Sequence, residues 1–281
     1  MDALQTLSFQ AAGEAWTVDL TLGISIAIPL FGETAEPSCF SAPPSSISAF
    51  SGPGFSGRVS SGASCNVSTL TINPHCNGTH TESIAHLLRD ERGCPVGERA
   101  LNPQLGTLVT LEPRRAELDQ DRYNAHARPH DLRLSRAALE ASLANTPNVW
   151  LSALVIRTRC ARSHPNRVYQ EPSCVPYLTP SAMSYLRERG VLHLLIDSPS
   201  VDRLDDGGEL LSHRAYWGLE PGVDVLTSSA RVEATITEMI EAPDTLPDGH
   251  YLISIGAPAL AIDATPSRPV LFPVQKREET P

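Results

Sequence analysis

The chain has 281 residues, 41% of them hydrophobic and 19% charged, which is the balance of a globular protein large enough to bury a sizeable core. Its formal net charge of −10 argues against nucleic acid as a partner, because phosphate binding requires a basic face, and it disfavours docking on an anionic membrane. The most apolar run, residues 20–31, is far shorter than the roughly 20 residues that a membrane-spanning helix needs.

The N-terminal part combines a strand-like segment with a long irregular one. Residues 19–31 are rich in Ile and Leu and interrupted by Gly23, which predicts one bent strand or a strand pair. Residues 38–68 turn to Ser, Pro and Gly, which predicts a long loop rather than a linker between domains. The first residues show no basic leader followed by an apolar stretch, and the six cysteines form no Cys-x-x-Cys pair. We therefore expect a cytoplasmic protein with reduced thiols.

Helix and strand signals alternate in the second half of the chain. The predicted elements are a helix at 135–144, a strand at 149–156, a helix opening at 179–180, a buried strand at 191–197 and short strands at 251–255 and 269–273. The second helix has the clearest signals, since Thr179 suits the N-cap, Pro180 the first turn and Gly190 the end. The mixture predicts an α/β (α+β) fold in which strands dominate, with residues 1–281 as a single domain.

Residues 74–86, PHCNGTHTESIAH, gather three of the nine histidines with a cysteine and a glutamate. A proline, an asparagine and a glycine disfavour a helix here, so a strand with a turn or a loop is expected. Neighbouring side chains of an extended segment point to opposite faces. His75 and Cys76 are therefore not expected to reach one site together, whereas His80 and Glu82 share a face. His, Cys and Glu are all metal ligands, and Cys with His favours zinc-like ions.

The same segment resembles the signature of the cyclase family of metal-dependent hydrolases, which includes the bacterial kynurenine formamidases. That signature reads His-x-Gly-Thr/Ala-His-x-Asp, followed after three residues by another His. Alignment on residues 78–80 places Cys76 at the first histidine, Glu82 at the aspartate and His86 at the trailing histidine. Two expected ligand positions therefore differ from the family pattern.

Further blocks resemble the family in the same chain order, from about residue 19 to 273. They are residues 19–21 (DLT), 176–178 (PYL), 195–202 (LIDSPSVD), 211–217 (LSHRAYW), 235–238 (TITE), 256–258 (GAP) and 263–270 (DATPSRPV). By this resemblance His213 and Glu238 are downstream metal ligands, and the longer spacing between them implies an inserted loop at 218–232. We expect Asp197 and Asp202 to shape the turn after their strand or to support a ligand.

The resemblance implies a swivelling β/β/α fold and a divalent metal held by protein side chains. The implied ligands are Cys76, His80, Glu82, His213 and Glu238. His75 replaces Cys76 if a local bulge turns it inward, and loss or weakening of the site is a third alternative. Zinc is the expected metal, with manganese as the alternative, and either one or two ions fit these ligands.

The resemblance also implies hydrolysis of a linear amide, as in the arylformamidases of tryptophan catabolism. Water activated by the metal would attack the carbonyl, with His86 as the acid and base and Glu82 as its partner. Tyr216 and Trp217 are candidates to wall the pocket of a small-molecule substrate. The alternatives are a hydrolase of a lactone, imide or cyclic amide, and a catalytically silent binding protein. A homo-oligomer, either a dimer or a tetramer, is expected.

Overall fold

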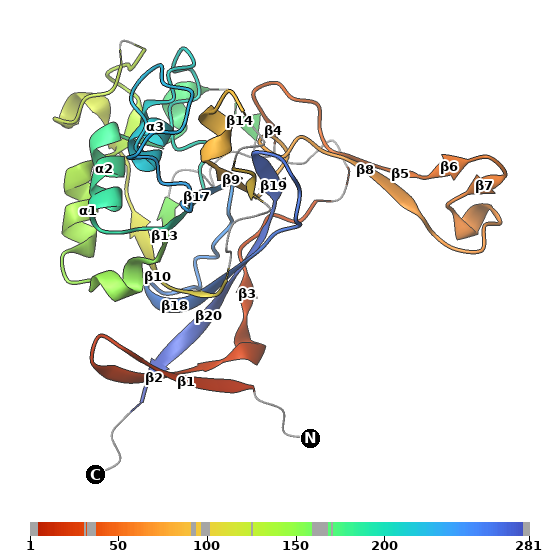
Figure 1. The fold of residues 1–281 in the computed structure, drawn as a ribbon, viewed down its shortest axis with the longest axis horizontal. Helices are drawn as coiled ribbons and strands as arrows, with labels where there is room; N and C mark the ends of the chain where they lie inside the picture. Colours follow the sequence, from red (N-terminus) through yellow and green to blue (C-terminus); the bar gives the residue numbers. More distant parts are fainter. Residues whose placement is uncertain are drawn as a thin grey trace.

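A computed structural model describes residues 5–30, 32, 38–90, 94–96, 102–124, 126–158, 168–169 and 171–277, and one large mixed sheet organises them (Figure 1). In spatial order its strands are β1 (Thr6–Ala11), β2 (Glu14–Asp19), β20 (Arg268–Lys276), β18 (Gly249–Gly256), β10 (Gln104–Leu111), β13 (Ala153–Thr158), β16 (His193–Ile196), β17 (Thr235–Glu238), β9 (His80–Ser83) and β19 (Ala264–Pro266), with β3 (Ile24–Ser25) paired to β20. Strands β10, β13, β16 and β17 run parallel, and the other pairs in this sheet are antiparallel.

Helices cover one face of the central strands. They are α1 (Arg136–Leu143), α2 (Pro180–Glu188) and α3 (Leu211–Trp217). Alternate residues of a strand point to opposite faces. Leu154 and Ile156 accordingly join the core shared with the helices, whereas Ala153 and Val155 join a second core built with β18, β20 and the segment around β3. The parallel centre of the sheet is thus buried on both faces.

Local sequence signals explain the helices. Helix α2 begins after Thr179, whose Oγ1 accepts a hydrogen bond from the N–H of Ala182 at 3.2 Å, and it ends before Gly190, which has a φ of 80°. Helix α1 starts directly after Ser135, and β16 lies inside the buried run predicted at 191–197. The prediction of a strand-rich α/β fold is confirmed.

Two predicted segments differ in detail. The strand expected at 149–156 starts only at Ala153, because residues 148–151 form a 3-10 helix after Pro147. The strand or strand pair expected at 19–31 is divided: β2 ends at Asp19, a 3-10 helix follows, and β3 begins at Ile24.

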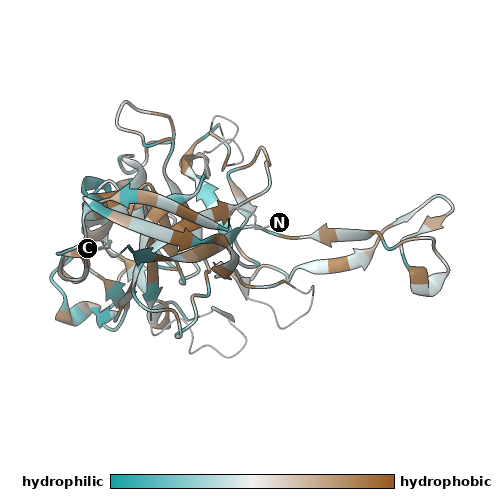
Figure 2. Ribbon diagram, turned by 90° about the horizontal axis from the view of Figure 1, so that it is seen from below, coloured by the Kyte–Doolittle hydropathy of each residue, from teal (hydrophilic) through white to brown (hydrophobic). Residues whose placement is uncertain are grey.

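The segment predicted as a loop at 38–68 contains strands instead. Strands β5 (Ser46–Ala49) and β8 (Ser68–Thr71) form an antiparallel hairpin, whose tip carries β6 (Ser51–Gly52) and β7 (Phe55–Ser56). We call residues 46–71 the arm, because they project well away from the sheet in both views (Figures 1 and 2). Backbone pairing makes this structure despite a composition of Ser, Gly and Pro.

Smaller elements complete the description. Strand β4 (Ser38–Cys39) pairs with β14 (Val168–Tyr169), while β11 (Arg114–Arg115), β12 (Leu132–Leu134) and β15 (Tyr177–Leu178) form a separate small sheet. Residues 218–232 form turns without a helix or strand. Across the described residues, no helix combines the length and the apolar character that a bilayer crossing requires.

Candidate metal centre

Strand β9 is the middle of the candidate site. It lies between β17 and β19, and its His80 and Glu82 are two residues apart, so they point to one face of the sheet. Both side chains are fully buried. The register of the β9–β17 pair sets His80 opposite Glu238, and His80 Nε2 lies 3.5 Å from Glu238 Oε2.

The turn before β9 fixes the tautomer of His80. His80 Nδ1 lies 2.9 Å from the carbonyl oxygen of Gly78, which can only accept a hydrogen bond, so Nδ1 carries the proton. Gly78 has a φ of 144°, and a Cβ there would lie 2.9 Å from Leu30 Cδ2, so glycine is required. His80 Nε2 is therefore a bare nitrogen. It is buried and has no hydrogen-bond partner.

Glu82 faces a histidine with each carboxylate oxygen. Its Oε1 lies 2.9 Å from His213 Nε2. Its Oε2 lies 3.3 Å from His75 Nδ1, but without hydrogen-bond geometry, and this buried oxygen has no hydrogen-bond partner. One glutamate thus joins two histidines from distant parts of the chain.

His213 is held from behind by Asp202. Asp202 Oδ2 lies 2.6 Å from His213 Nδ1, and the aspartate also accepts hydrogen bonds from the N–H groups of Ser212 and His213 in the first turn of α3. Tyr123 donates a further hydrogen bond to Asp202 Oδ1 at 2.5 Å. A carboxylate behind a histidine fixes the orientation of the ring, here with Nε2 toward Glu82.

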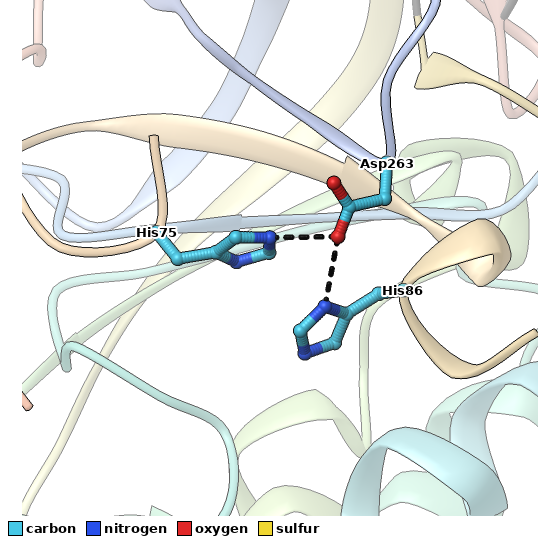
Figure 3. A group of neighbouring side chains, drawn as sticks. All are labelled: His75, His86 and Asp263. Carbon is cyan, nitrogen blue, oxygen red and sulfur yellow. Dashed lines mark hydrogen bonds and ion pairs between the residues drawn. The ribbon is translucent and has the colours of Figure 1, made fainter. Parts of the chain in front are cut away.

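A second carboxylate with two histidines lies on the less buried side of the site. Asp263 Oδ2 lies 2.9 Å from His75 Nε2 and 3.0 Å from His86 Nδ1 (Figure 3). His86 belongs to the 3-10 helix Ile84–Leu87 that directly follows β9, and Ser83 caps this helix by accepting a hydrogen bond from the N–H of Ala85. The rings of His75 and His86 lie 4.3 Å apart between centroids.

The arrangement fits a divalent cation. Within the described residues, three groups bring their ligand atoms to within 4.8 Å of one another: His75 with His80 and Glu82, Glu82 with His86 and His213, and His75 with His86 and Asp263. The unpaired His80 Nε2 and Glu82 Oε2 are buried, and such atoms are costly unless something binds them. Nitrogen and carboxylate ligands suit zinc, and also manganese.

The buried carboxylates and histidines of the site shift one another's pKa values against the effect of burial. Burial alone would raise the pKa of Glu82, but the positive charges of His213 and His86 hold that pKa well below its usual range. Burial would lower the pKa of His213, whereas Glu82 and Asp202 raise it well above its ordinary value. For His75, burial also acts downward, but Asp263 and Glu82 raise the pKa to about 10. Protons thus occupy the spaces between these carboxylates and imidazoles, and metal binding would release them.

Cys76 lies outside the groups that could hold a metal. It is buried in a small apolar cluster with Ile28, Cys39 and Met239. A hydrogen bond from Cys39 lowers the pKa of its thiol to about 7, against the effect of burial and together with the charges of His75 and His80. Of the two alternatives for the first ligand, the structure brings His75 and not Cys76 to Glu82.

Tyr216 and Trp217, expected in the pocket wall, lie in the hydrophobic core instead. Neither is exposed, and the Tyr216 hydroxyl and the Trp217 indole N–H donate hydrogen bonds to backbone carbonyls. Trp217 packs 5.5 Å from the ring of His213, so these aromatics support the site from within the core.

The structure also brings in a residue that sequence reasoning did not assign to the site. The family resemblance includes Asp263 in the block 263–270 without a role at the site, yet it contacts both His75 and His86. Asp263 lies just before β19, which pairs with β9. A prediction of this strand pairing would therefore have placed Asp263 beside the histidines.

Comparisons with known proteins show the family of the chain. A family described as "Putative cyclase" matches residues 18–203. The kynurenine formamidases of Bacillus mycoides (strain KBAB4) and Bacillus cereus (strain ATCC 14579) are each 26% identical over 212 residues, which is 75% of this chain and 82% of theirs.

Solved structures share the fold at low identity. A predicted metal-dependent hydrolase from Bacillus stearothermophilus has a TM-score of 0.58 at 15% identity, covering 89% of this chain and 97% of its own. An isatin hydrolase bound to the product analogue thioisatinate has a TM-score of 0.57 at 13% identity, covering 90% and 92%. The family match covers well over half of the sequence, and the predicted relationship is confirmed: the chain belongs to the cyclase family.

Proposed function

We propose that the protein is a metal-dependent hydrolase that cleaves a linear amide in the manner of an arylformamidase. The kynurenine formamidase relatives support the reaction class. The observation that carries the proposal is the environment of Glu82, a buried carboxylate with His213 at 2.9 Å and His75 at 3.3 Å, beside the bare nitrogen of His80. Among these converging ligand atoms, His80 Nε2 and Glu82 Oε2 have no hydrogen-bond partner.

The proposed ligands are His75, His80, Glu82, His213 and Glu238, and zinc is the proposed metal. A divalent cation there would supply Lewis acidity, which would polarise the scissile carbonyl and lower the pKa of a water molecule. The side chains hold it in a site whose inner wall excludes solvent, since all but His75 are buried. Asp202 engages Nδ1 of His213, which leaves Nε2 as the nitrogen that would bind the cation.

His86 is the proposed acid and base. Its Nδ1 is engaged by Asp263, so proton transfer falls to Nε2. From Nε2 the imidazole can take a proton from water and return it to the departing amine. The product amine then leaves neutral, together with the carboxylic acid.

The test is turnover combined with metal content. We would purify the protein without chelators, measure bound metal by elemental analysis, load zinc or manganese, and assay N-formylkynurenine beside lactones, imides and cyclic amides. We expect bound metal and turnover of a linear formamide, and loss of both in His80→Ala. Turnover of cyclic amides but not of linear formamides would make cyclic amides the substrate class. A wild-type protein that binds no metal would instead indicate a silent binding protein.

We further propose a cytoplasmic homo-oligomer in which the arm contacts a second copy. The five cysteines in the described part of the chain are free thiols, which suits a reducing compartment. Ile47 and Leu70 are register partners in the arm and are 43% and 53% exposed. A two-stranded hairpin is marginally stable by itself. Residues 46–71 carry a single charge, at Arg58, so copies of a chain with net charge −10 meet there with least repulsion.

A further inference from the structure

We propose that Asp263 is a positioning residue that sets the tautomers of two histidines at once, and that it thereby makes His75, in place of Cys76, a metal ligand while it orients His86 for proton transfer. This inference rests on the proposed function, because it assigns a role to a residue of the same metal centre. It adds a residue, and a reason why the departure from the family pattern at position 76 is tolerated.

The backbone places Asp263 beside the histidines independently of its side chain. Its carbonyl oxygen accepts a hydrogen bond from the N–H of Ser83 at 2.9 Å, which extends the pairing of β19 with β9 by one residue. The carboxylate therefore sits at the end of the strand that carries His80 and Glu82. From there it reaches both His75 and His86 (Figure 3).

The Asp263 carboxylate determines which ring nitrogens of the two histidines carry protons. An ionised aspartate only accepts hydrogen bonds, so both nitrogens near Asp263 Oδ2 must carry protons. These are His75 Nε2 at 2.9 Å and His86 Nδ1 at 3.0 Å. Each neutral ring then keeps its other nitrogen bare: Nδ1 in His75 and Nε2 in His86.

The Nδ1 of His75 requires a positive charge beside it. It lies 3.3 Å from Glu82 Oε2, so two lone pairs face each other in a buried setting unless a proton or a metal ion lies between them. A metal ion that also binds His80 Nε2 satisfies all three atoms, because the three groups lie within 4.8 Å of one another. Carboxylate, imidazole and metal in a row are a recurrent arrangement in metal sites.

Cys76 has no comparable route to the metal. Its side chain packs with apolar neighbours, and the turn before Gly78 presents the preceding residue, His75, to Glu82. The cysteine at the family's first histidine position thus packs beside Cys39 outside the ligand groups, and His75 with Asp263 performs the ligand's role from one residue earlier.

The same aspartate couples the ligand to the acid and base. His75 and His86 share one carboxylate oxygen and lie with ring centroids 4.3 Å apart and planes 32° apart. A shift of Asp263 therefore disturbs both rings. Loss of the carboxylate should weaken metal binding and proton transfer together, which an aspartate with a merely structural role would not do.

The test compares Asp263→Asn with two controls in the full chain. Asp224→Asn removes an exposed carboxylate that pairs with Arg89 and belongs to none of the ligand groups, and Cys76→Ala tests the alternative ligand. We would measure zinc affinity by chelator competition, kcat and KM at saturating zinc, and the ring ¹⁵N shifts of the histidines in the zinc-loaded protein. His75→Gln and His86→Gln would assign those shifts.

For Asp263→Asn we expect zinc affinity to fall about 10- to 100-fold, as for other partners of metal ligands. We also expect kcat at saturating zinc to fall by about 100-fold or more, with KM changed less, because proton transfer is impaired. The ¹⁵N shifts should show fixed tautomers of His75 and His86 in the wild type and mixed tautomers in the variant. Both controls should match the wild type.

Three results would overturn the inference. The first is unchanged affinity and kcat in Asp263→Asn beside an active wild type, which leaves the proposed function intact. The second is loss of zinc from Cys76→Ala, which would make the thiol a ligand. The third is loss of one whole equivalent of metal from Asp263→Asn, which would make Asp263 itself a ligand. If the variant folds poorly, the wild-type tautomers alone decide: a proton on His75 Nδ1 in the zinc-loaded protein contradicts the inference.

Discussion

The two sides of Glu82 carry the same chemical arrangement in different surroundings. On each side a histidine has one nitrogen near Glu82 and the other near an aspartate. On the deep side, His213 and Asp202 have side chains that are 3% and 0% exposed. On the shallow side, His75 and Asp263 are 23% and 28% exposed, and Asp263 has a second histidine, His86, beside it.

The deep side is suited to ion binding and the shallow side to exchange with solvent. The deep pair is tied into the first turn of α3 by backbone hydrogen bonds to Asp202, so it can hold an ion in a fixed place. The shallow side keeps contact with solvent, which proton exchange and substrate entry both require. A buried histidine with an aspartate behind it can bind a metal ion. A partly exposed histidine can also exchange protons with solvent.

Removal of His213 should break the deep side and have the largest effect. His213→Ala leaves Glu82 and Asp202 as buried carboxylates without their partner, which costs about 3–5 kcal/mol of unfolding free energy. Metal affinity should fall more than about 100-fold, because loss of a mere partner of a ligand already costs 10- to 100-fold. Urea unfolding and chelator competition measure both. His193→Asn, at another buried histidine, is the control and should bind metal normally.

Asp202→Asn should sharpen the comparison with Asp263. Both variants lose a carboxylate behind a histidine, so both should bind zinc about 10- to 100-fold more weakly. Asp202 also accepts hydrogen bonds from α3, so its variant should lose about 1.5–3 kcal/mol of unfolding free energy. Asp263→Asn should lose less unfolding free energy, because Asp263 is partly exposed. Equal losses of stability in the two variants would argue against the distinction between a deep and a shallow side.

His193 shows what burial does to a histidine without a carboxylate. Burial and the charge of Arg231 lower its pKa to about 4. The unfolded chain binds a proton near pH 6.5 and the folded chain does not, so the stabilising contribution present above that pH is lost as the pH falls toward 4. Between pH 7 and pH 5 the unfolding free energy should decrease by about 2 kcal/mol from this residue.

That decrease should be absent from His193→Asn, which urea titrations at the two pH values would reveal. An equal pH dependence in the wild type and the variant would contradict the assignment. The histidines beside Glu82 should behave in the opposite sense, since their carboxylate partners raise the pKa values of His75 and His213.

The arm should have the smallest effect on the centre. Ile47→Ser with Leu70→Ser removes an exposed apolar pair and should weaken self-association about 10- to 100-fold, as loss of apolar anchors does at interfaces. Metal affinity should not change. Light scattering across a concentration series measures the association, with Ser48→Thr and Thr69→Ser, a register pair of the same hairpin, as the control. A monomeric wild type would remove the basis for the proposed oligomer.

Sequence reasoning reached the parts of the molecule that depend on local patterns. The two-residue spacing of His80 and Glu82 predicted a shared face, and Thr179 with Pro180 marked the start of α2, because both depend only on near neighbours along the chain. The family resemblance located His213 and Glu238, and the structure brings both to His80 and Glu82.

Features that depend on distant pairing were not accessible in this way. Asp263 is 177 residues from His86, so only the pairing of β19 with β9 reveals their contact. The orientation of His75 and Cys76 depends on a turn whose geometry the spacing left open. The arm was hidden because Ser and Gly favour loops, while its hairpin depends on backbone hydrogen bonds that most residue types can make.

The late position of Asp263 and β19 bears on how the protein matures in the cell. At a synthesis rate of roughly 5–20 residues per second, the ribosome needs about 9–35 seconds to make the 177 residues between His86 and Asp263. During that interval the nascent chain displays histidines without the carboxylate that orders them. Under the proposed function, the ion would be bound in its final site only after residue 263 has been made, so a chain truncated before Asp263 would lack the carboxylate that orders His75 and His86.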